Sequence, residues 1–197
     1  MTRKMMKTNA RDSLRGNWGI AILTLLIGYV LTAAASCVFG VGELIVIGPI
    51  ETGLALIFMK LSYHDNAEVG DLFVPFQNFA NTFFAGFLVT IFTFLWTLLL
   101  VVPGIVKGIA YSQTFFIMNE HPDFTGKEAI DASQGMMLGH KWEYFVLSLS
   151  FIGWFLLCII TFGLMLFYVL PYYQATMAEY YRYLKESQEP RVEAPEF

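Results

Sequence analysis

The chain has 197 residues, of which 56% are hydrophobic and 14% are charged, and its formal net charge is −4. Soluble domains carry about 45–50% apolar and about 25% charged residues, so this composition excludes an ordinary water-soluble domain and a basic nucleic-acid-binding protein. The two cysteines, Cys37 and Cys158, lie in apolar runs without CxxC or ligand spacing. They are predicted to be buried thiols, and no metal or cofactor is expected.

Six apolar segments follow one another along the chain, and we predict that they cross a membrane as three helical hairpins. The hairpins cover about 17–61, about 82–118 and about 142–181. The first segment of each hairpin is near the ~20 residues that ~30 Å of hydrocarbon requires. The predicted fold class is therefore all-α, a polytopic membrane helix bundle that forms a single domain over residues 1–184. Breaks are expected at Gly48-Pro49, at the turn Pro103-Gly104 and at Thr161-Phe162-Gly163.

The basic residues give this bundle an orientation. Eleven of the twelve Lys and Arg residues fall on one side of the six crossings, and only Lys107 falls on the other. Lys and Arg near membrane spans stay on the cytoplasmic side, so both termini are predicted to be cytoplasmic. The eleven are Arg3, Lys4, Lys7, Arg11, Arg15, Lys60, Lys127, Lys141, Arg182, Lys185 and Arg191.

Amphipathic segments are expected on the cytoplasmic leaflet. Met5–Leu14 sets apolar residues against basic ones, as in a helix lying on an anionic membrane surface. Asp71–Asn81 interleaves aromatic with polar residues, and Thr125 to Glu128 form a capping-box pattern that opens a helix closed near Gly139. The acidic segment 185–197 is predicted to be a disordered cytoplasmic tail.

The order of elements suggests a threefold repeat of surface helix, long span, proline-containing turn and second span. The prolines are Pro49, Pro103 and Pro171. Apolar hairpins also resemble one another by composition alone, so both explanations stay open. The start of the chain has two explanations as well, a secretory signal or a retained first helix. The small residues before Cys37 suit both a peptidase site and a helix-packing face, and we expect a retained helix.

Glu51 is the carboxylate of most interest within the spans, and Lys107 is the basic residue on the opposite side from the others. Such residues are often functional, although Glu51 also suits the first turn of a helix after Pro49, where the dipole favours an anion. Lys107 follows Pro103 at an equivalent place. We therefore predict an ion pair between Glu51 and Lys107 at the outer end of the bundle.

Asp131, Ser133, His140 and Lys141 share one cytoplasmic stretch. Ser133 and His140 are seven residues apart on a predicted helix that ends at Gly139, a spacing that does not suit a Ser-His-Asp triad. There is no G-x-S-x-G elbow and no evident oxyanion site, so this stretch is expected to be a solvated, lipid-facing helix. Tyr111, Ser112 and Trp154 are polar or amphipathic residues that either line an interior path or form interhelical hydrogen bonds. The positions selected for function or structure are Glu51, Lys107, Tyr111, Ser112, Ser133, His140, Lys141, Trp154, Pro103 and Pro171.

Two stretches resemble a known family. They are Pro103-Gly104-Ile105-Val106-Lys107 with Tyr111-Ser112, and Glu128 to Trp154, including Gly139-His140-Lys141-Trp142, followed by Pro171-Tyr172. Together with Gly16-Asn17-Trp18 they resemble the bacterial membrane-protein family known as domain of unknown function 975, over roughly residues 8–184. Gln134 departs from the pattern, where a lysine is expected. The resemblance implies a multi-pass protein of the bacterial plasma membrane and brings no established activity.

The sequence is compatible with three kinds of function. The first is a non-enzymatic component that binds membrane lipid or a membrane-protein partner, and a solid core with a lipid-sized lateral groove would favour it. The second is a small transporter or flippase, acting as a homo-oligomer through proline-broken helices, and a central cavity touching Glu51 or Lys107 would favour it. The third, an intramembrane enzyme, needs a pocket that unites Ser133 or His140 with an acidic group.

Overall fold

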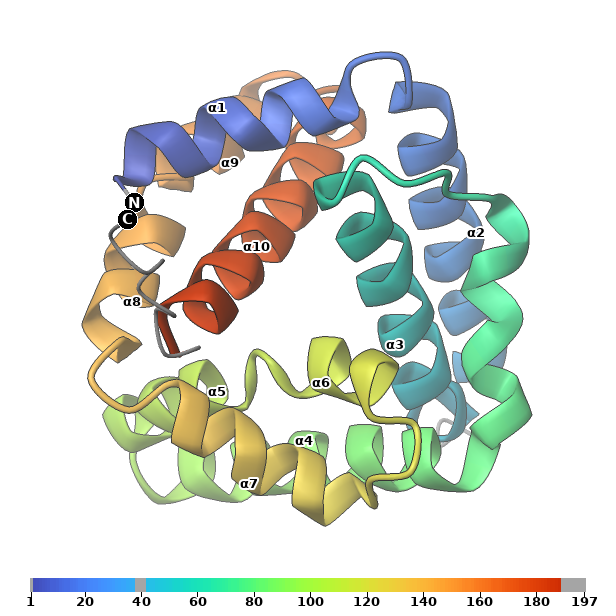
Figure 1. The fold of residues 1–197 in the computed structure, drawn as a ribbon, viewed down its shortest axis with the longest axis vertical. Helices are drawn as coiled ribbons and strands as arrows, with labels where there is room; N and C mark the ends of the chain where they lie inside the picture. The colour runs from blue at the N-terminus through green and yellow to red at the C-terminus, as the bar shows by residue number, and fades with distance from the viewer. Residues whose placement is uncertain (1, 38–41, 189–197) are drawn as a thin grey trace, which may run out of the picture.

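The structure is a computed structural model that describes residues 2–37 and 42–188, and within these ranges all regular structure is helical (Figure 1). The predicted all-α class is confirmed. The elements are α1 (Arg3–Leu14), α2 (Trp18–Ser36), α3 (Gly42–Ser62), the 3-10 helix η1 (Val69–Asn78), α4 (Phe79–Leu99), α5 (Val101–Tyr111), α6 (Thr114–Glu120), α7 (Gly126–Met136), α8 (Lys141–Leu149), α9 (Ile152–Ile160) and α10 (Leu166–Gln188).

Five segments of the described chain are long and apolar enough to cross a membrane. They are Trp18–Ser36, Gly42–Ser62, Val69–Leu99, Val101–Glu120 and Lys141–Ile160. The helix α10, predicted to form the sixth crossing, is not among them, because polar and charged residues fill its C-terminal half. The chain therefore has the helices of a membrane protein, with a last helix of mixed character.

Of the three predicted breaks, the one at Gly48-Pro49 is absent, the one at Pro103-Gly104 is displaced to Leu100, and the one at Thr161-Phe162-Gly163 is confirmed. The helix α3 continues through Gly48-Pro49, and its backbone there packs so closely on α4 that a Cβ at Gly48 would collide with the Thr82 carbonyl. This tertiary contact holds a helix that the local sequence disfavours. Pro103 lies in the first turn of α5, where its missing N–H costs nothing. Phe162 and Gly163 have positive φ values of 49° and 87° and join α9 to α10.

Two breaks were not predicted. The expected fourth crossing is divided into α5 and α6 by Ser112 and Gln113, and the expected fifth is divided into α8 and α9 by Ser150 and Phe151. Each break leaves backbone N–H and C=O groups that the helix itself does not pair. Both breaks matter for the site described below.

Helices form at α1 and α7, two of the segments predicted to lie on the membrane surface. In α7 the Thr125 hydroxyl accepts from the Glu128 backbone N–H, and the Glu128 carboxylate accepts from the Thr125 N–H at 2.7 Å, which completes the predicted capping box. Segment 71–81 is divided between η1 and the start of α4. The helix α10 continues to Gln188, so residues 185–188 are helical, contrary to the predicted disordered tail. Residues 189–197, including Arg191, lie outside the described residues.

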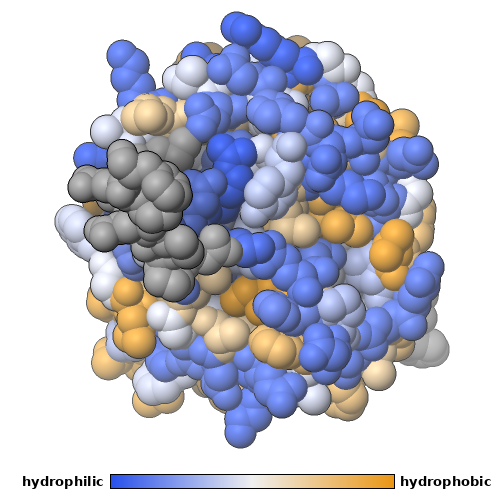
Figure 2. All heavy atoms as spheres, in the orientation of Figure 1, coloured by the Kyte–Doolittle hydropathy of each residue, from blue (hydrophilic) through white to orange (hydrophobic). Residues whose placement is uncertain are grey.

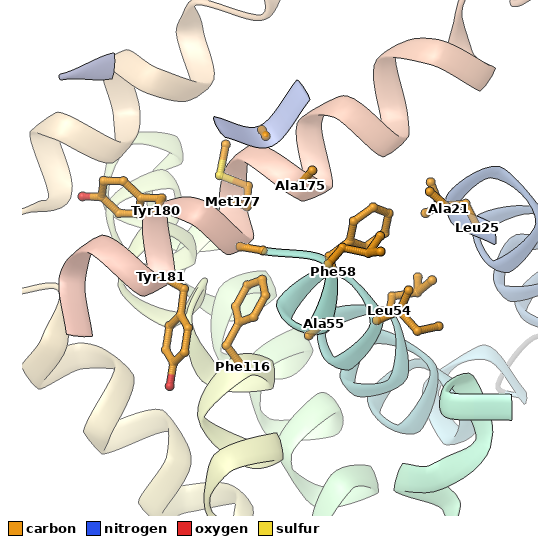
Figure 3. Packing of buried hydrophobic residues seen from close by; sticks show 14 of the residues in the cluster. Ala21, Leu25, Leu54, Ala55, Phe58, Phe116, Ala175, Met177, Tyr180 and Tyr181 are labelled. Atoms are coloured by element: carbon orange, nitrogen blue, oxygen red, sulfur yellow. The ribbon is translucent and has the colours of Figure 1, made fainter. Parts of the chain in front are cut away.

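The surface helices pack against the second helices of the predicted hairpins. The helix α1 lies across α10, η1 lies against α3, and α7 contacts α4 and α6 (Figure 1). Between them, Phe58 of α3, Phe116 of α6 and Tyr181 of α10 are buried in one core (Figure 3), and the rings of Phe116 and Tyr181 stack at 5.1 Å. Aromatic side chains of this kind form part of the core between the helices.

Polar and apolar side chains occupy different parts of the surface. The face in Figure 2, over α1 and α7, is largely hydrophilic. Large apolar side chains are exposed elsewhere, as at Leu98 (73%), Ile159 (75%) and Phe162 (99%). Soluble monomers rarely expose apolar surface this widely, so these helices suit contact with lipid.

Candidate functional site

The break between α5 and α6 is closed by a side chain from α7. Ser133 is fully buried, and its hydroxyl donates to the Ala110 carbonyl oxygen at 2.8 Å while it accepts from the Gln113 backbone N–H at 3.2 Å. One hydroxyl thus satisfies a carbonyl and an amide at the interruption. Because the Ser133 proton is committed to Ala110, the geometry gives Ser133 a structural role at the break.

Buried polar side chains surround the same break. The Gln113 amide donates to the Ser112 hydroxyl at 2.8 Å, and Tyr144 of α8 lies against Ser112 and Tyr173. Within residues 2–37 and 42–188, the buried side-chain oxygens of Gln113 (Oε1) and Thr114 (Oγ1) have no hydrogen-bond partner. Buried polar atoms are normally paired, so unpaired oxygens at a helix break are an unusual local feature.

The break between α8 and α9 is closed by a side chain from α1. The Lys7 ammonium donates to the Ser150 carbonyl oxygen at 3.3 Å and lies 4.0 Å from the centre of the Phe151 ring. Burial lowers the pKa of Lys7, and Arg11 and Arg3 lower it further. Arg11, one turn along α1, lies over the Tyr172 ring at 4.9 Å. The basic face of α1 therefore packs on α8–α10 through its cations.

A polar network joins the ends of α3, α6 and α10. The Glu179 carboxylate accepts from the Ser62 hydroxyl at 2.8 Å and pairs with Arg182 at 2.8 Å, and Arg182 also donates to the Ser62 carbonyl. Glu120 of α6 accepts from the Tyr181 hydroxyl at 2.8 Å and from the Lys185 ammonium at 2.9 Å. These contacts hold three helix ends together.

Two apolar grooves run along the flanks of the bundle. The α5–α8 groove has a volume of about 400 Å3 and is lined by Val102, Ile105, Val106, Ile109, Lys141, Trp142 and Phe145. The α2–α10 groove has a volume of about 320 Å3 and is lined by Ile22, Leu25, Leu26, Tyr29, Phe162, Gly163, Leu164, Leu166, Phe167, Leu170 and Pro171. Both volumes lie in the range of ligand pockets, roughly 300–1,000 Å3.

A third groove is more polar. It lies between α3, η1 and α6, has a volume of about 280 Å3 and includes Asn78 and Asn119. The Asn119 amide is already bonded to the Thr52 carbonyl at 2.8 Å, and the Asn78 amide is bonded to the Pro122 carbonyl. The Asn78 and Asn119 amides therefore serve helix packing.

The predicted ion pair between Glu51 and Lys107 is wrong. The Lys107 ammonium donates to the Gln134 amide oxygen of α7 at 3.1 Å and lies 5.4 Å from the Trp96 ring. Glu51 makes no hydrogen bond or ion pair with another described residue. The side chain of Lys107 is long enough to reach a surface helix, so the expectation of a lysine isolated at the outer end also fails.

The remaining predicted residues are brought together only in part. Tyr111 and Ser112 lie at the α5–α6 break beside Ser133, whereas His140 lies at the start of α8, with Nδ1 3.4 Å from Glu143. Lys141 lines the α5–α8 groove and Pro171 lines the α2–α10 groove. Trp154 packs on Tyr168 and Tyr172 in an aromatic cluster, and Pro103 remains a helix-start residue. These residues do not form one catalytic constellation.

Three residues with clear roles were missed. Gln113, Lys7 and Glu179 are buried or half-buried polar residues that close breaks or join helix ends. The pair Ser112-Gln113 in an apolar run is a signal for a break, and Glu179 in a helix predicted as a crossing is a signal for a buried partner. Within the described residues, no group of His, Cys, Asp and Glu is placed to hold a metal ion.

Comparison with known families tests the resemblance. Residues 98–188 match the model of the family described as protein of unknown function (DUF975). The predicted resemblance is thus confirmed over this region. The matched DUF975 region runs from the end of α4 to the end of α10 and contains both helix breaks and the whole α5–α8 groove. No protein with curated annotation and no solved structure matches the chain.

Proposed function

We propose that this protein is a multi-pass component of the bacterial plasma membrane that binds membrane lipid in lateral grooves and catalyses no reaction. The observation that carries the proposal is the placement of its cavities. Two grooves of about 400 and 320 Å3 have almost wholly apolar linings, and Phe58, Phe116 and Tyr181 are buried in a core between the helices. Apolar grooves beside a packed core suit the binding of acyl chains.

The proposed orientation has both termini in the cytoplasm and six crossings. The hydrophilic face of Figure 2 lies over α1 and α7, and Arg3, Lys4 and Lys127 are exposed on these two helices. Basic residues are retained on the cytoplasmic side. The helix α10 then returns the chain across the membrane as the sixth crossing, with its polar C-terminal end on the cytoplasmic side.

The proposed threefold repeat is supported by how the surface helices pack. The helix α1 contacts α10, η1 contacts α3 and α7 contacts α6. Each surface helix thus covers the second helix of the preceding hairpin, with α1 and α10 closing the circle. Three equivalent units would give a cyclic pattern of this kind.

A second candidate is a small oligomeric transporter. It is favoured by the buried, unpaired oxygens of Gln113 and Thr114 at the α5–α6 break, since discontinuous helices form the substrate sites of several transporters. It is weakened by the grooves, because none of the three described above is lined by Glu51 or Lys107.

Native mass spectrometry in a mild detergent tests the proposal. The expected spectrum contains the protein with one or two lipids retained after extensive washing. Transport activity in proteoliposomes without retained lipid would instead favour the second candidate. A lipid-free protein that also transports nothing contradicts both.

A further inference from the structure

The α5–α8 groove differs from the α2–α10 groove in one chemical respect. Its lining includes Lys141, whereas the α2–α10 groove is lined only by uncharged residues. Four apolar residues of α5 form one wall, and Trp142 and Phe145, whose rings lie 5.5 Å apart, form part of the other. The groove is therefore apolar, with one cationic side chain in its lining.

The charge of Lys141 is available to a ligand. Lys141 makes no hydrogen bond or ion pair with another described residue, and it is only partly exposed. The nearest acidic residue along the helix, Glu143, already faces His140 at 3.4 Å. An ammonium without a protein partner beside apolar surface matches an anionic head attached to an acyl chain.

Trp142 suits the same ligand. Its side chain is 73% exposed although it lies beside the apolar groove. Tryptophan is enriched where hydrocarbon meets the headgroup layer, because its ring is apolar and its N–H is polar. Lys141 and Trp142 together therefore mark the headgroup level of the groove.

We infer that the α5–α8 groove binds an anionic phospholipid, with an acyl chain along Val102, Ile105, Val106 and Ile109 and the phosphate at Lys141. This inference rests on the proposed lipid-binding function and names the lipid class for one of its grooves. The α2–α10 groove holds acyl chains without selecting a headgroup, because its lining has no charge.

The test is competition between two lipids of identical acyl chains, phosphatidylglycerol and phosphatidylethanolamine, added in equal amounts to the delipidated protein and counted by native mass spectrometry. The wild-type protein is expected to prefer phosphatidylglycerol about fivefold, the factor for one lysine at a membrane surface. Lys141→Gln is expected to abolish this preference while lipid of both classes still binds, and Lys141→Arg is expected to keep it.

Two further variants separate the groove from general surface charge. Lys127→Gln removes an exposed cation of α7 that lines neither groove and is expected to leave the preference unchanged. Val106→Trp fills the α5–α8 groove and is expected to lower bound phosphatidylglycerol, with the melting temperature measured to confirm folding. An unchanged preference in Lys141→Gln, or an equal loss in Lys127→Gln, overturns the inference, whereas wild-type protein that binds neither lipid overturns the proposed function.

Discussion

The two helix breaks of the matched region differ in the side chain that pairs with their backbone groups. Each interrupts a segment with the length and composition of a membrane crossing, and each is closed by a surface helix from elsewhere in the chain. At α5–α6 the closing group is the neutral, fully buried hydroxyl of Ser133, which pairs with two backbone groups. At α8–α9 it is the charged, half-buried ammonium of Lys7, which pairs with one carbonyl.

This difference has an energetic consequence. A buried backbone group that loses its partner costs about 1–3 kcal/mol, because water does not replace the lost bond. A charged group near the surface keeps access to water and is screened by salt. The α5–α6 break should therefore depend on Ser133 far more than the α8–α9 break depends on Lys7.

The largest expected effect is that of Ser133→Ala. Removing the hydroxyl leaves the Ala110 carbonyl and the Gln113 N–H unpaired, so the free energy of unfolding should fall by about 2–4 kcal/mol. Unfolding in mixed micelles titrated with SDS measures this change. Ser13→Ala is the matched control, because Ser13 is also buried on a surface helix but bonds only to the Ala10 carbonyl of its own helix. Equal losses in the two variants would contradict the role of Ser133.

A smaller effect is expected for Lys7→Gln. The variant loses the cation over the Phe151 ring, an interaction of about 1 kcal/mol, and it weakens the bond to the Ser150 carbonyl. Hydrogen exchange should increase around Ser150 and Phe151 while the α5–α6 break stays protected. Lys4→Gln, which changes an exposed lysine of the same helix, serves as the control. The comparison fails if exchange rises at both breaks or at neither.

The double variant of Ser133→Ala and Lys7→Gln tests whether the two breaks are independent. Ser133 and Lys7 share no contact, so their losses should add to within about 0.5 kcal/mol. The same SDS titration measures the sum. A markedly larger loss would mean that α1 and α7 close the two breaks as one cooperative unit.

The smallest effect concerns the capping box that holds the start of α7. The Thr125 backbone N–H and hydroxyl lower the pKa of the Glu128 carboxyl. A lowered folded-state pKa means that the carboxylate stabilises the fold above its unfolded pKa of about 4.3 and loses this effect as the pH falls through the lower folded value. Thermal melts across this acidic range should show a pH dependence that Glu128→Gln reduces.

Asp123→Asn is the control for this titration. Asp123 is exposed in the loop before α7 and makes no hydrogen bond with another described residue. Its variant should keep the pH dependence of the wild-type protein. A profile that changes as much in Asp123→Asn as in Glu128→Gln would show that the capping box is not the source.

The parts of the fold that the sequence predicts are those with local causes. The capping box at Thr125, the apolar runs and the break at Phe162-Gly163 follow from neighbouring residues and match the structure. The breaks at Ser112 and Ser150 have no glycine or proline beside them, and each exists because a distant helix supplies a partner. At Gly48-Pro49 the local sequence predicts a break, but close packing against α4 keeps the helix continuous.

The same distinction between local and distant causes applies to the residues of the candidate site. Ser112, Ser133 and Lys141 were selected as polar residues of an apolar chain, and the structure gives them roles at a break and in a groove. The pairing of Lys107 with Gln134 was missed because the two residues lie on different helices. The sequence does contain one indication of this contact. Gln134 stands where the family resemblance leads us to expect a lysine, and a lysine at that position would repel Lys107.

Lipid retention by groove-filled variants tests the central claim most directly. The double variant Leu26→Trp with Val106→Trp fills both grooves, and Leu98→Trp adds the same side chain at an exposed apolar position that lines neither. After extensive detergent washing, native mass spectrometry should find lipid on the wild-type protein and on Leu98→Trp, and little on the double variant. Equal lipid on all three proteins, or none on the wild type, would contradict binding in the grooves.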